Sequence, residues 1–304
     1  MSYLYRLAGD DMELAEADLN GFLESQGLEE AERHGRIALT DSEPEQLRRL
    51  ALTHEVSRLE WQGDIDDFRT DYRPEGSFAV RVHGAGNSRE LQERIGRVLE
   101  TEENSVDLEN PENVLNLYIT EEKAFLGEQV DDLPRGKFEE RKNHERPFSS
   151  PVSLDPSLAR LLVNLSAVPA GGHVLDPFCG TGGILIEAGL CGIGVHGLDI
   201  QEDMVSGTEK NLEEYGIIAH EIREGEVSQA REIFDQEFDA VITDLPYGKA
   251  SRKEQEPVKE FLEVAPDLTD GKIVFMSDQS QVGEHEPEYE VYVHRNLTRY
   301  IYVV

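Results

Sequence analysis

The chain has 304 residues, of which 63 are Asp or Glu and 29 are Lys or Arg, so its formal net charge at pH 7 is −34. A chain of this length can build about two domains, each with its own core. The acidic residues are spread along the whole chain, which argues against a disordered acidic tail as the source of the charge. We predict a surface adapted to concentrated salt, where a Debye length of about 3 Å screens repulsion between like charges. A protein that binds basic partners is the alternative.

The chain carries no pattern of secretion or membrane insertion. It has no apolar run of 18 residues, and its first 25 residues already hold six acidic side chains. We therefore expect neither a signal peptide nor a membrane span. The two cysteines, Cys179 and Cys191, lie outside any CxxC motif, so no disulfide framework or zinc site is expected. These observations predict a cytoplasmic protein that binds no metal, and we expect a monomer.

The first 130 residues show an α+β pattern, in which strand and helix periodicities alternate. The predicted strands cover residues 3–7, 36–39, 77–83, 114–119 and 123–126, the last two joined by a Thr-Glu-Glu turn. The predicted helices cover residues 15–23, 47–54 and 91–99. Trp61 and Tyr72 also lie in this region, and we expect them in its core rather than stacked on nucleic acid.

Residues 131–148 lose hydrophobic periodicity and contain Pro134, Gly136 and Pro147, which predicts a linker between two domains. Within it, residues 135–146 are basic, with five cationic side chains against three acidic ones. A basic patch in an acidic chain is suited to contact with phosphates. The candidate RNA-binding residues are Arg135, Lys137, Arg141, Lys142 and Arg146. A solvated linker that happens to be basic is the alternative.

Residues 149–304 show the alternation of strands and helices that is typical of an α/β domain. The first helix is predicted to start at Pro156, with Asp155 as its N-cap. Strands are expected at 173–176, 195–200, 219–223, 238–244 and 272–277, and helices from 184, at 204–215 and at 258–265. This order predicts a parallel sheet covered on both faces. Residues 289–295 and 298–304 form a predicted hairpin, so the last strand should be antiparallel.

The first strand of this sheet ends in DPFCGTGG, residues 176–183, where an acid precedes three glycines and a helix. Such glycines bring bare backbone N–H groups close to a ligand. The string is neither GxGxxG nor GxxxxGK[ST], which argues against a dinucleotide fingerprint and excludes a P-loop. An acid at this place suits a ligand with an ammonium or sulfonium group and would repel a pyrophosphate. We therefore predict S-adenosylmethionine as the cofactor.

Two more acids follow the next two strands. Asp199 closes the second strand, where its carboxylate would accept hydrogen bonds from both ribose hydroxyls. Glu226 follows the third strand and would either reach the adenine amino group or face solvent. The predicted cofactor-binding residues are Asp176, Pro177, Phe178, Gly180, Thr181, Gly182, Asp199, Ile200 and Glu226.

The fourth strand ends in TDLPYG, residues 243–248, so another acid lies at a strand end. DPFCGTGG followed by TDLPYG, in a sheet that ends in a hairpin, resembles the class I (Rossmann-like) methyltransferases that modify exocyclic amino nitrogens. With RPFSSPVSLDPSLARLLVNLS at 146–166 and an N-terminal region similar to a THUMP domain, the whole chain resembles the archaeal tRNA (guanine-10-N2) dimethyltransferases.

This resemblance implies three parts and a partner. Residues 1–130 would form the THUMP-containing α+β region, 131–148 a basic linker, and 149–304 the methyltransferase domain. The implied partner is tRNA. The implied grip on the target amino group lies on Asp244, Leu245, Pro246 and Tyr247, with Leu245 standing where the general pattern has a proline.

The chemistry expected at this motif follows from the amine. An exocyclic amino group on guanine is a poor nucleophile because its lone pair is delocalised into the ring. Hydrogen bonds from its protons to Asp244, and to a carbonyl near Leu245 or Pro246, would build electron density on nitrogen. Tyr247 would stack on the extruded base. Because the carboxyl ends of parallel strands meet at one edge of a sheet, we expect Asp176 and Asp244 to share one pocket.

Other interpretations remain at this stage. The target could be another tRNA guanosine or another nucleic-acid base, and a non-catalytic RNA-binding protein with a decayed pocket is a third hypothesis. Asp176 and Asp244 could be helix N-caps. Cys179 is expected to be a small loop residue rather than a nucleophile, since no base is near it in the sequence. His196 is expected to be packed in the core.

Overall fold

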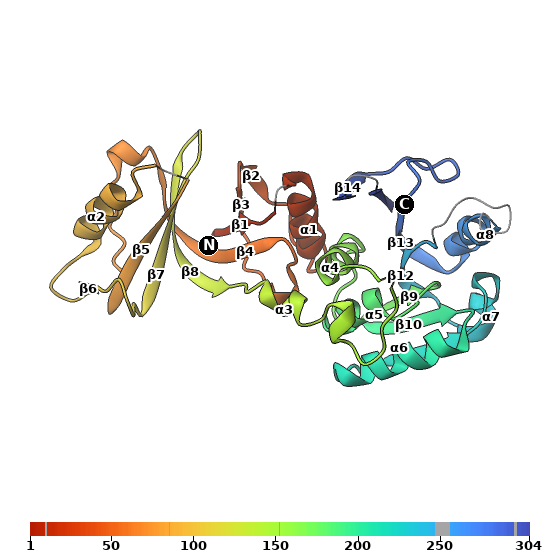
Figure 1. Ribbon diagram of the computed structural model, residues 1–304. Helices are drawn as coiled ribbons and strands as arrows, with labels where there is room; N and C mark the ends of the chain where they lie inside the picture. The colour runs from red at the N-terminus through yellow and green to blue at the C-terminus, as the bar shows by residue number, and fades with distance from the viewer. Residues whose placement is uncertain (10, 85, 152, 247–255, 295–296) are drawn as a thin grey trace. The chain divides into compact units, whose positions relative to one another are not determined.

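The computed structural model describes residues 1–304 except 10, 85, 152, 247–255 and 295–296. Its chain forms two compact units (Figure 1). The first unit comprises Met1–Glu16, Leu28–Arg48 and Leu52–Pro134, and the second comprises Ala17–Gly27, Arg49–Ala51 and Arg135–Val304. The break after Pro134 lies inside the predicted linker. Two short N-terminal segments group with the second unit, which no pattern in the sequence indicated.

An eight-stranded sheet is the frame of the first unit, in the order β2-β3-β1-β4-β8-β7-β5-β6. Its strands are β1 (Tyr3–Leu7), β2 (Glu32–His34), β3 (Ile37–Thr40), β4 (Thr53–Gly63), β5 (Ser77–His83), β6 (Ser105–Val106), β7 (Asn113–Ile119) and β8 (Ala124–Asp132). The helical elements in this part of the chain are α1 (Met12–Glu24), η1 (Leu47–Arg49), η2 (Ile65–Asp67) and α2 (Ser88–Leu99). As predicted, β7 and β8 pair antiparallel across the Thr-Glu-Glu turn.

The core of this unit forms where α2 covers the sheet (Figure 1). Leu91, Ile95 and Leu99 of α2 are buried against strand residues of β5, β7 and β8. Val98, which lies in the same helix, is 38% exposed. Trp61 and Tyr72 pack against the same cluster, so the prediction that they belong to the core is confirmed.

The predicted helix at 47–54 is wrong. Residues 47–49 form only the short turn η1, and β4, the eleven-residue strand that follows, was not predicted. Polar side chains fill buried positions of β4: Glu55 accepts from the Arg6 Nε at 2.6 Å and from the Tyr118 hydroxyl at 3.1 Å, and Ser57 is fully buried. The polar inward residues remove the apolar alternation by which a half-buried strand is recognised.

The second unit contains a seven-stranded sheet in the order β11-β10-β9-β12-β13-β15-β14. Its strands are β9 (His173–Asp176), β10 (Gly194–Asp199), β11 (His220–Glu224), β12 (Phe238–Asp244), β13 (Thr269–Ser277), β14 (Tyr289–His294) and β15 (Leu297–Val303). Strands β9 to β13 pair in parallel. β15 pairs antiparallel with both β13 and β14. The predicted Rossmann-like sheet with an antiparallel end is therefore confirmed.

Helices and short helical turns surround this sheet. They are α3 (Gly136–Glu139), α4 (Pro156–Leu165), α5 (Gly183–Gly189), α6 (Glu202–Glu214), α7 (Ala230–Phe234) and α8 (Glu256–Val264), with the turns η3 (Asn143–Glu145), η4 (Val227–Gln229) and η5 (Ala265–Asp267). Of these, α4, α5 and α6 contact strands of the sheet directly, and α5 contacts both α4 and α6. Phe234 of α7 and Phe261 of α8 share one apolar cluster with the strand residues Val241 and Phe275. α7, with five residues, was not predicted because it is too short to show a helical period.

The stretch predicted as a linker is partly ordered. Its first two residues end β8, and α3 and η3 follow before α4. α4 starts as predicted, since the Asp155 carboxylate accepts from the Ser157 N–H at 3.0 Å. In the part of the chain that the structure describes, no helix has the length and apolar character needed to cross a bilayer. Within the same residues, no group of three or more His, Cys, Asp or Glu side chains could hold a metal ion.

Candidate active site

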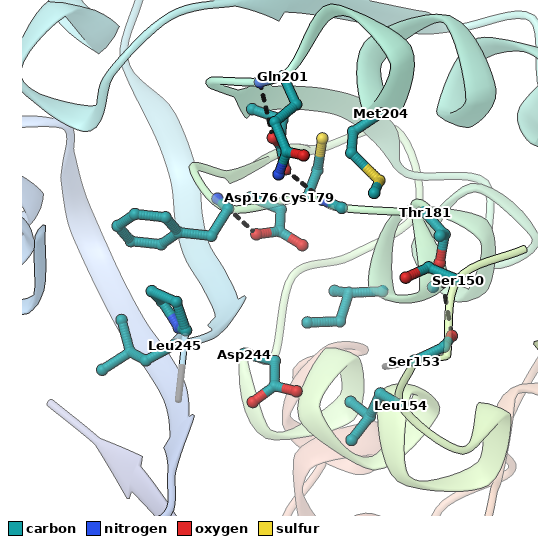
Figure 2. Close-up of a pocket in the computed structure, with 16 residues that line it drawn as sticks. Ser150, Ser153, Leu154, Asp176, Cys179, Thr181, Gln201, Met204, Asp244 and Leu245 are labelled. Carbon is teal, nitrogen blue, oxygen red and sulfur yellow. Dashed lines mark hydrogen bonds between the residues drawn. The ribbon is translucent and has the colours of Figure 1, made fainter. Parts of the chain in front are cut away.

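A cavity of about 290 Å³ lies in the second unit, where β9, β10 and β12 end (Figure 2). It brings together eight of the residues predicted from the two motifs and from Asp199. These are Asp176, Phe178, Gly180, Thr181, Asp199, Asp244, Leu245 and Pro246. The expectation that Asp176 and Asp244 share one cavity is confirmed. Helices α5 and α6 are the next helices after the first two of these strand ends, and the first residues of α5, Gly183 and Ile184, also line the cavity.

Asp176 is the most deeply buried acid of the cavity. Its Oδ1 accepts from the Thr243 hydroxyl at 2.6 Å and from the Phe178 N–H at 3.1 Å. Burial raises the pKa of Asp176 to about 7, and these two hydrogen bonds only partly oppose it. A carboxylate that water cannot stabilise gains most from a cation placed beside it. Asp176 therefore prepares this end of the cavity for a positively charged group.

The glycine loop after β9 takes a conformation that only glycine adopts readily. Gly182 has a φ of +77°, and a Cβ on it would lie 2.8 Å from Cγ2 of Thr208. Two side chains of α6 bind the backbone of this loop. The Thr208 hydroxyl donates to the Gly180 carbonyl at 2.6 Å, and the Asn211 amide donates to the Thr181 carbonyl at 2.9 Å. These two α6 residues were not predicted, because nothing in their spacing marks them as partners of a loop about 30 residues earlier.

Asp199 joins the glycine loop to the next helix. Its Oδ2 accepts from the Gly180 N–H and its Oδ1 from the Gln201 N–H, both at 3.0 Å. Each carboxylate oxygen can accept a second hydrogen bond. Burial raises the pKa of Asp199, and the two backbone donors oppose that rise. The carboxylate is thus fixed in place with capacity left for hydroxyl donors.

Asp244 is the last residue of β12 and lies at the same edge of the sheet as Asp176 and Asp199, where the parallel strands end. In Figure 2 its carboxylate lies among the residues that line the cavity, together with Asp176 and Leu245. Burial raises the pKa of Asp244 to about 6, although the neighbouring Arg299 guanidinium lowers it. Leu245 is buried, and its N–H donates to the Met276 carbonyl at 2.9 Å. A proline at 245 would have no N–H for this bond, so the departure from the general motif adds a backbone anchor.

Four predicted cofactor residues do not line the cavity. Pro177 is buried beside it, and Gly182 shapes the loop rather than the lining. Ile200 is 66% exposed. The exposed Glu226 forms a capping box with Gln229 at the start of η4. Contact of these four residues with a cofactor stays a prediction. Tyr247, predicted to stack on the base, lies outside the described residues.

Sequence reasoning missed half of the cavity lining. The additional residues are Ser150, Ser153, Leu154, Cys179, Gly183, Ile184, Gln201 and Met204. Ser153, whose hydroxyl lies 3.4 Å from that of Thr181, comes from the segment before α4. Cys179 and His196 are as predicted: burial raises the pKa of the Cys179 thiol, and His196 is packed among Phe234 and Phe238.

The basic residues of 135–146 fall into two groups. Arg141 donates twice to the fully buried Glu187, at 2.7 and 3.0 Å. Arg146 is 5% exposed and donates to the Arg141 carbonyl and the Ser153 hydroxyl. Lys137 is exposed, while Arg135 and Lys142 are partly exposed, with Lys142 paired to Glu139. Arg141 and Arg146 thus have structural partners, and RNA contact by the five stays a prediction.

Comparison with known proteins identifies the family. Residues 143–282 match the family described as RMKL-like, methyltransferase domain. The tRNA (guanine(10)-N2)-dimethyltransferase of Methanothermobacter thermautotrophicus is 35% identical over 336 residues, which cover 100% of this chain and 99% of that protein. This chain belongs to the tRNA (guanine(10)-N2)-dimethyltransferase family.

A second member of the dimethyltransferase family, from Pyrococcus abyssi, is 33% identical over 318 residues and 96% of each chain. Among solved structures, TrmN from Thermus thermophilus has a TM-score of 0.54 at 21% identity, covering 100% of this chain and 99% of that one. A methyltransferase solved in complex with SAH has a TM-score of 0.50 at 14% identity, covering 99% of this chain and 97% of that one. Both solved structures share the fold of this chain over almost its full length.

Proposed function

We propose that this chain transfers methyl groups from S-adenosylmethionine to the exocyclic N2 of guanosine 10 in tRNA, and that two rounds give the N2,N2-dimethyl product. The observation that carries this proposal is the convergence of Asp176 and Asp244 on one cavity. One carboxylate faces the site of a cationic donor, and the other is available to an amine. The names of the full-length relatives supply the nucleotide and the number of methyl groups.

The residues of the cavity fit S-adenosylmethionine. Three lining residues, Asp176, Asp199 and Asp244, are acidic, and none of the described lining residues is cationic. Such a set favours a cation over a pyrophosphate. Asp199 would hold the ribose hydroxyls, and the loop from Phe178 to Thr181 would enclose the donor. When bound, the cofactor supplies a methyl group made electrophilic by its sulfonium.

Asp244 prepares the amine. Its carboxylate accepts hydrogen bonds from the amino protons of the base, which returns electron density to N2 and aims its lone pair into the cavity. The backbone carbonyl of Leu245 or Pro246 is the second acceptor in this proposal. The new N–C bond would form as the methyl–sulfur bond breaks, with S-adenosylhomocysteine as the leaving group. N2 must also lose one proton, and the hydrogen bond to Asp244 gives that proton a path out. Holding the two reactants in line supplies a further part of the rate by proximity.

The first unit takes the role of tRNA docking in this proposal, as a THUMP-like domain would. Three basic side chains of the predicted patch are at least partly exposed and, unlike Arg141, are not shown paired with a buried carboxylate. They are Arg135, Lys137 and Lys142, all in the second unit. They would contact phosphates close to the methyltransferase domain. Because the chain has a net charge of −34, recognition of the shape of the tRNA would contribute more of the binding free energy than counterion release.

The proposal is tested with two matched transcripts of one tRNA, which carry guanosine or inosine at position 10. Inosine has the guanine ring without the N2 amino group. We expect labelled methyl transfer to the guanosine transcript, with N2-methyl- and N2,N2-dimethylguanosine at position 10 by nucleoside mapping, and none at position 10 of the inosine transcript. Equal labelling of the two transcripts would overturn the proposal, because the methyl group would then go elsewhere.

A further inference from the structure

A buried arginine contacts the acid of the second motif. Arg299 on β15 is 4% exposed, and its Nη2 donates to Oδ1 of Asp244. The two residues are 55 positions apart in the chain, and β13 lies between their strands in the sheet. The guanidinium therefore reaches past the end of β13 to meet the end of β12. Among the described residues, Arg299 is the hydrogen-bond donor to this carboxylate that the structure shows.

This ion pair is not explained by stability alone. Removing a guanidinium and a carboxylate from water costs several kcal/mol per ion, and their attraction only about balances that cost. The neighbouring positions of β15, Ile301 and Tyr302, are buried and apolar, so packing of this strand in the sheet does not by itself require a charged side chain. A charged pair that adds little stability, with its carboxylate facing the cavity, points to a role in the chemistry.

The charges around Asp244 show what Arg299 changes. In addition to burial, Asp278 raises the pKa of Asp244, and the charge of Asp244 in turn raises the pKa of Asp176 across the cavity. Among the described residues, Arg299 is the cation that lowers the pKa of Asp244 against the effects of burial and of Asp278. A protonated Asp244 would offer an O–H donor where the amino group of the base needs an acceptor.

We propose that Arg299 is a positioning residue for methyl transfer, which holds Asp244 through Oδ1, keeps the carboxylate charged, and leaves Oδ2 to accept the amino protons of the base. The inference rests on the proposed function, since it assigns Arg299 a role in that reaction. It acts through Asp244 and has no contact of its own with the donor in this scheme. An arginine suits this place because its planar guanidinium stays charged when buried.

The first test is the pH dependence of transfer under single-turnover conditions, measured for wild type, Arg299→Met and Arg299→Lys. The pKa of Asp244 is about 6 with Arg299 present, so wild-type transfer should fall below that pH. Loss of an adjacent opposite charge moves a carboxylate pKa up by about 1–3 units. We expect the acidic limb of Arg299→Met to move to higher pH by that amount, and Arg299→Lys to lie between. An acidic limb that stays in place would overturn the inference.

The second test is a double-mutant cycle with Asp244→Asn, whose side chain does not ionise. If Arg299 acts through Asp244, Arg299→Met slows transfer about 10–100-fold at pH 7 in the wild type and has little further effect in the Asp244→Asn protein. An equal loss in both backgrounds would show a merely structural role. The matched control is Arg223→Met, which removes an exposed Arg–Glu pair from β11 of the same sheet and should leave the pH profile unchanged.

Calorimetric titration with S-adenosylhomocysteine shows whether each variant keeps a folded cavity. If Arg299→Met does not fold, Arg299→Gln carries the pH test, because it removes the charge and keeps a polar side chain at this place. The outcomes separate the two proposals. Wild-type protein that does not label the guanosine transcript refutes the function, whereas wild-type activity with an unaltered pH profile in the Arg299 variants refutes only this inference.

Discussion

Asp176 shows how a functional residue can reduce the stability of the fold around it. Its pKa is raised by burial to about 7, well above the value of an unfolded aspartate, so the folded state prefers the protonated form. The favourable contribution of Asp176 to the free energy of unfolding is therefore complete below about pH 4, and it is lost as pH rises through 7. Above pH 7 the cofactor-free protein holds a buried negative charge.

We expect Asp176→Asn to stabilise the cofactor-free protein at pH 8 by about 1–3 kcal/mol and to leave its stability at pH 4 nearly unchanged. An asparagine oxygen can keep the hydrogen bonds from Thr243 and Phe178. The same change should weaken cofactor binding, since the cation loses its partner. Urea unfolding at the two pH values and calorimetry check this, with the exposed Asp270→Asn as control. Lower stability of Asp176→Asn at pH 8 would contradict the account.

The residues found from the sequence were those at strand ends. Asp176, Asp199 and Asp244 were predicted because each closes an apolar run, and the ends of parallel strands meet at one edge. Arg299 was not predicted, because its partner lies on a strand that is not its neighbour in the sheet. Ser150 and Ser153 were missed for a similar reason: they reach the cavity from a segment before the sheet begins.

At the scale of elements, α6 joins two segments that line the cavity. The buried Asn211 donates to the carbonyls of Phe148 and Thr181, and its own side-chain oxygen accepts from the Phe148 N–H at 2.9 Å. At Gly207, α6 lies so close to the Phe148 ring that a Cβ on this glycine would be 2.1 Å from it. One side chain outside the cavity thereby fixes the glycine loop and the segment that contains Ser150 and Ser153.

Asn211→Ala should therefore lower cofactor affinity about tenfold and destabilise the protein by about 1–3 kcal/mol, since it leaves buried backbone groups without partners. Calorimetry and urea unfolding measure the two effects. The matched control is Glu213→Ala, two residues along on the exposed side of the same helix. Cofactor affinity equal to that of the control would show that the loop holds its shape without α6.

The elements of the second unit were easier to predict than those of the first. Every strand of the second sheet was located, since most of these strands are short apolar runs between helical patterns and the last two form the predicted hairpin. In the first unit, β4 has Glu55 and Ser57 in buried positions, and β2 has only three residues. Both lack the apolar alternation that sequence patterns can show.

At the scale of the whole molecule, the net charge of −34 sets the expected response to salt. Repulsion among surface carboxylates opposes the compact state, and concentrated salt screens it. We expect the thermal midpoint to rise by about 10 °C between 0.1 and 2 M KCl. Since 1 kcal/mol raises it by only about 2–4 °C in a chain of 150–250 residues, this rise corresponds to several kcal/mol of screened repulsion. A midpoint equal at both salt concentrations would remove the interpretation of the surface as adapted to salt.

The division of the chain into two units depends in part on long-range contacts. The break after Pro134 falls where the sequence loses hydrophobic periodicity. That residues 17–27 and 49–51 group with the second unit could not be predicted, because the contacts responsible are long-range. Asp18 accepts from the Asn164 amide at 2.7 Å and from the Ala51 N–H at 2.9 Å, which ties both segments to α4.

The most direct test of the central claim separates cofactor binding from transfer in Asp244→Ala. Calorimetry with S-adenosylhomocysteine and single-turnover transfer to unmodified tRNA would be measured on the same preparation. We predict that the affinity stays close to that of wild type while the rate of transfer falls about 10²–10⁴-fold, since the amine loses its acceptor. Transfer at the wild-type rate with binding intact would contradict the assignment of Asp244, and with it the scheme of one acid for the donor and one for the amine.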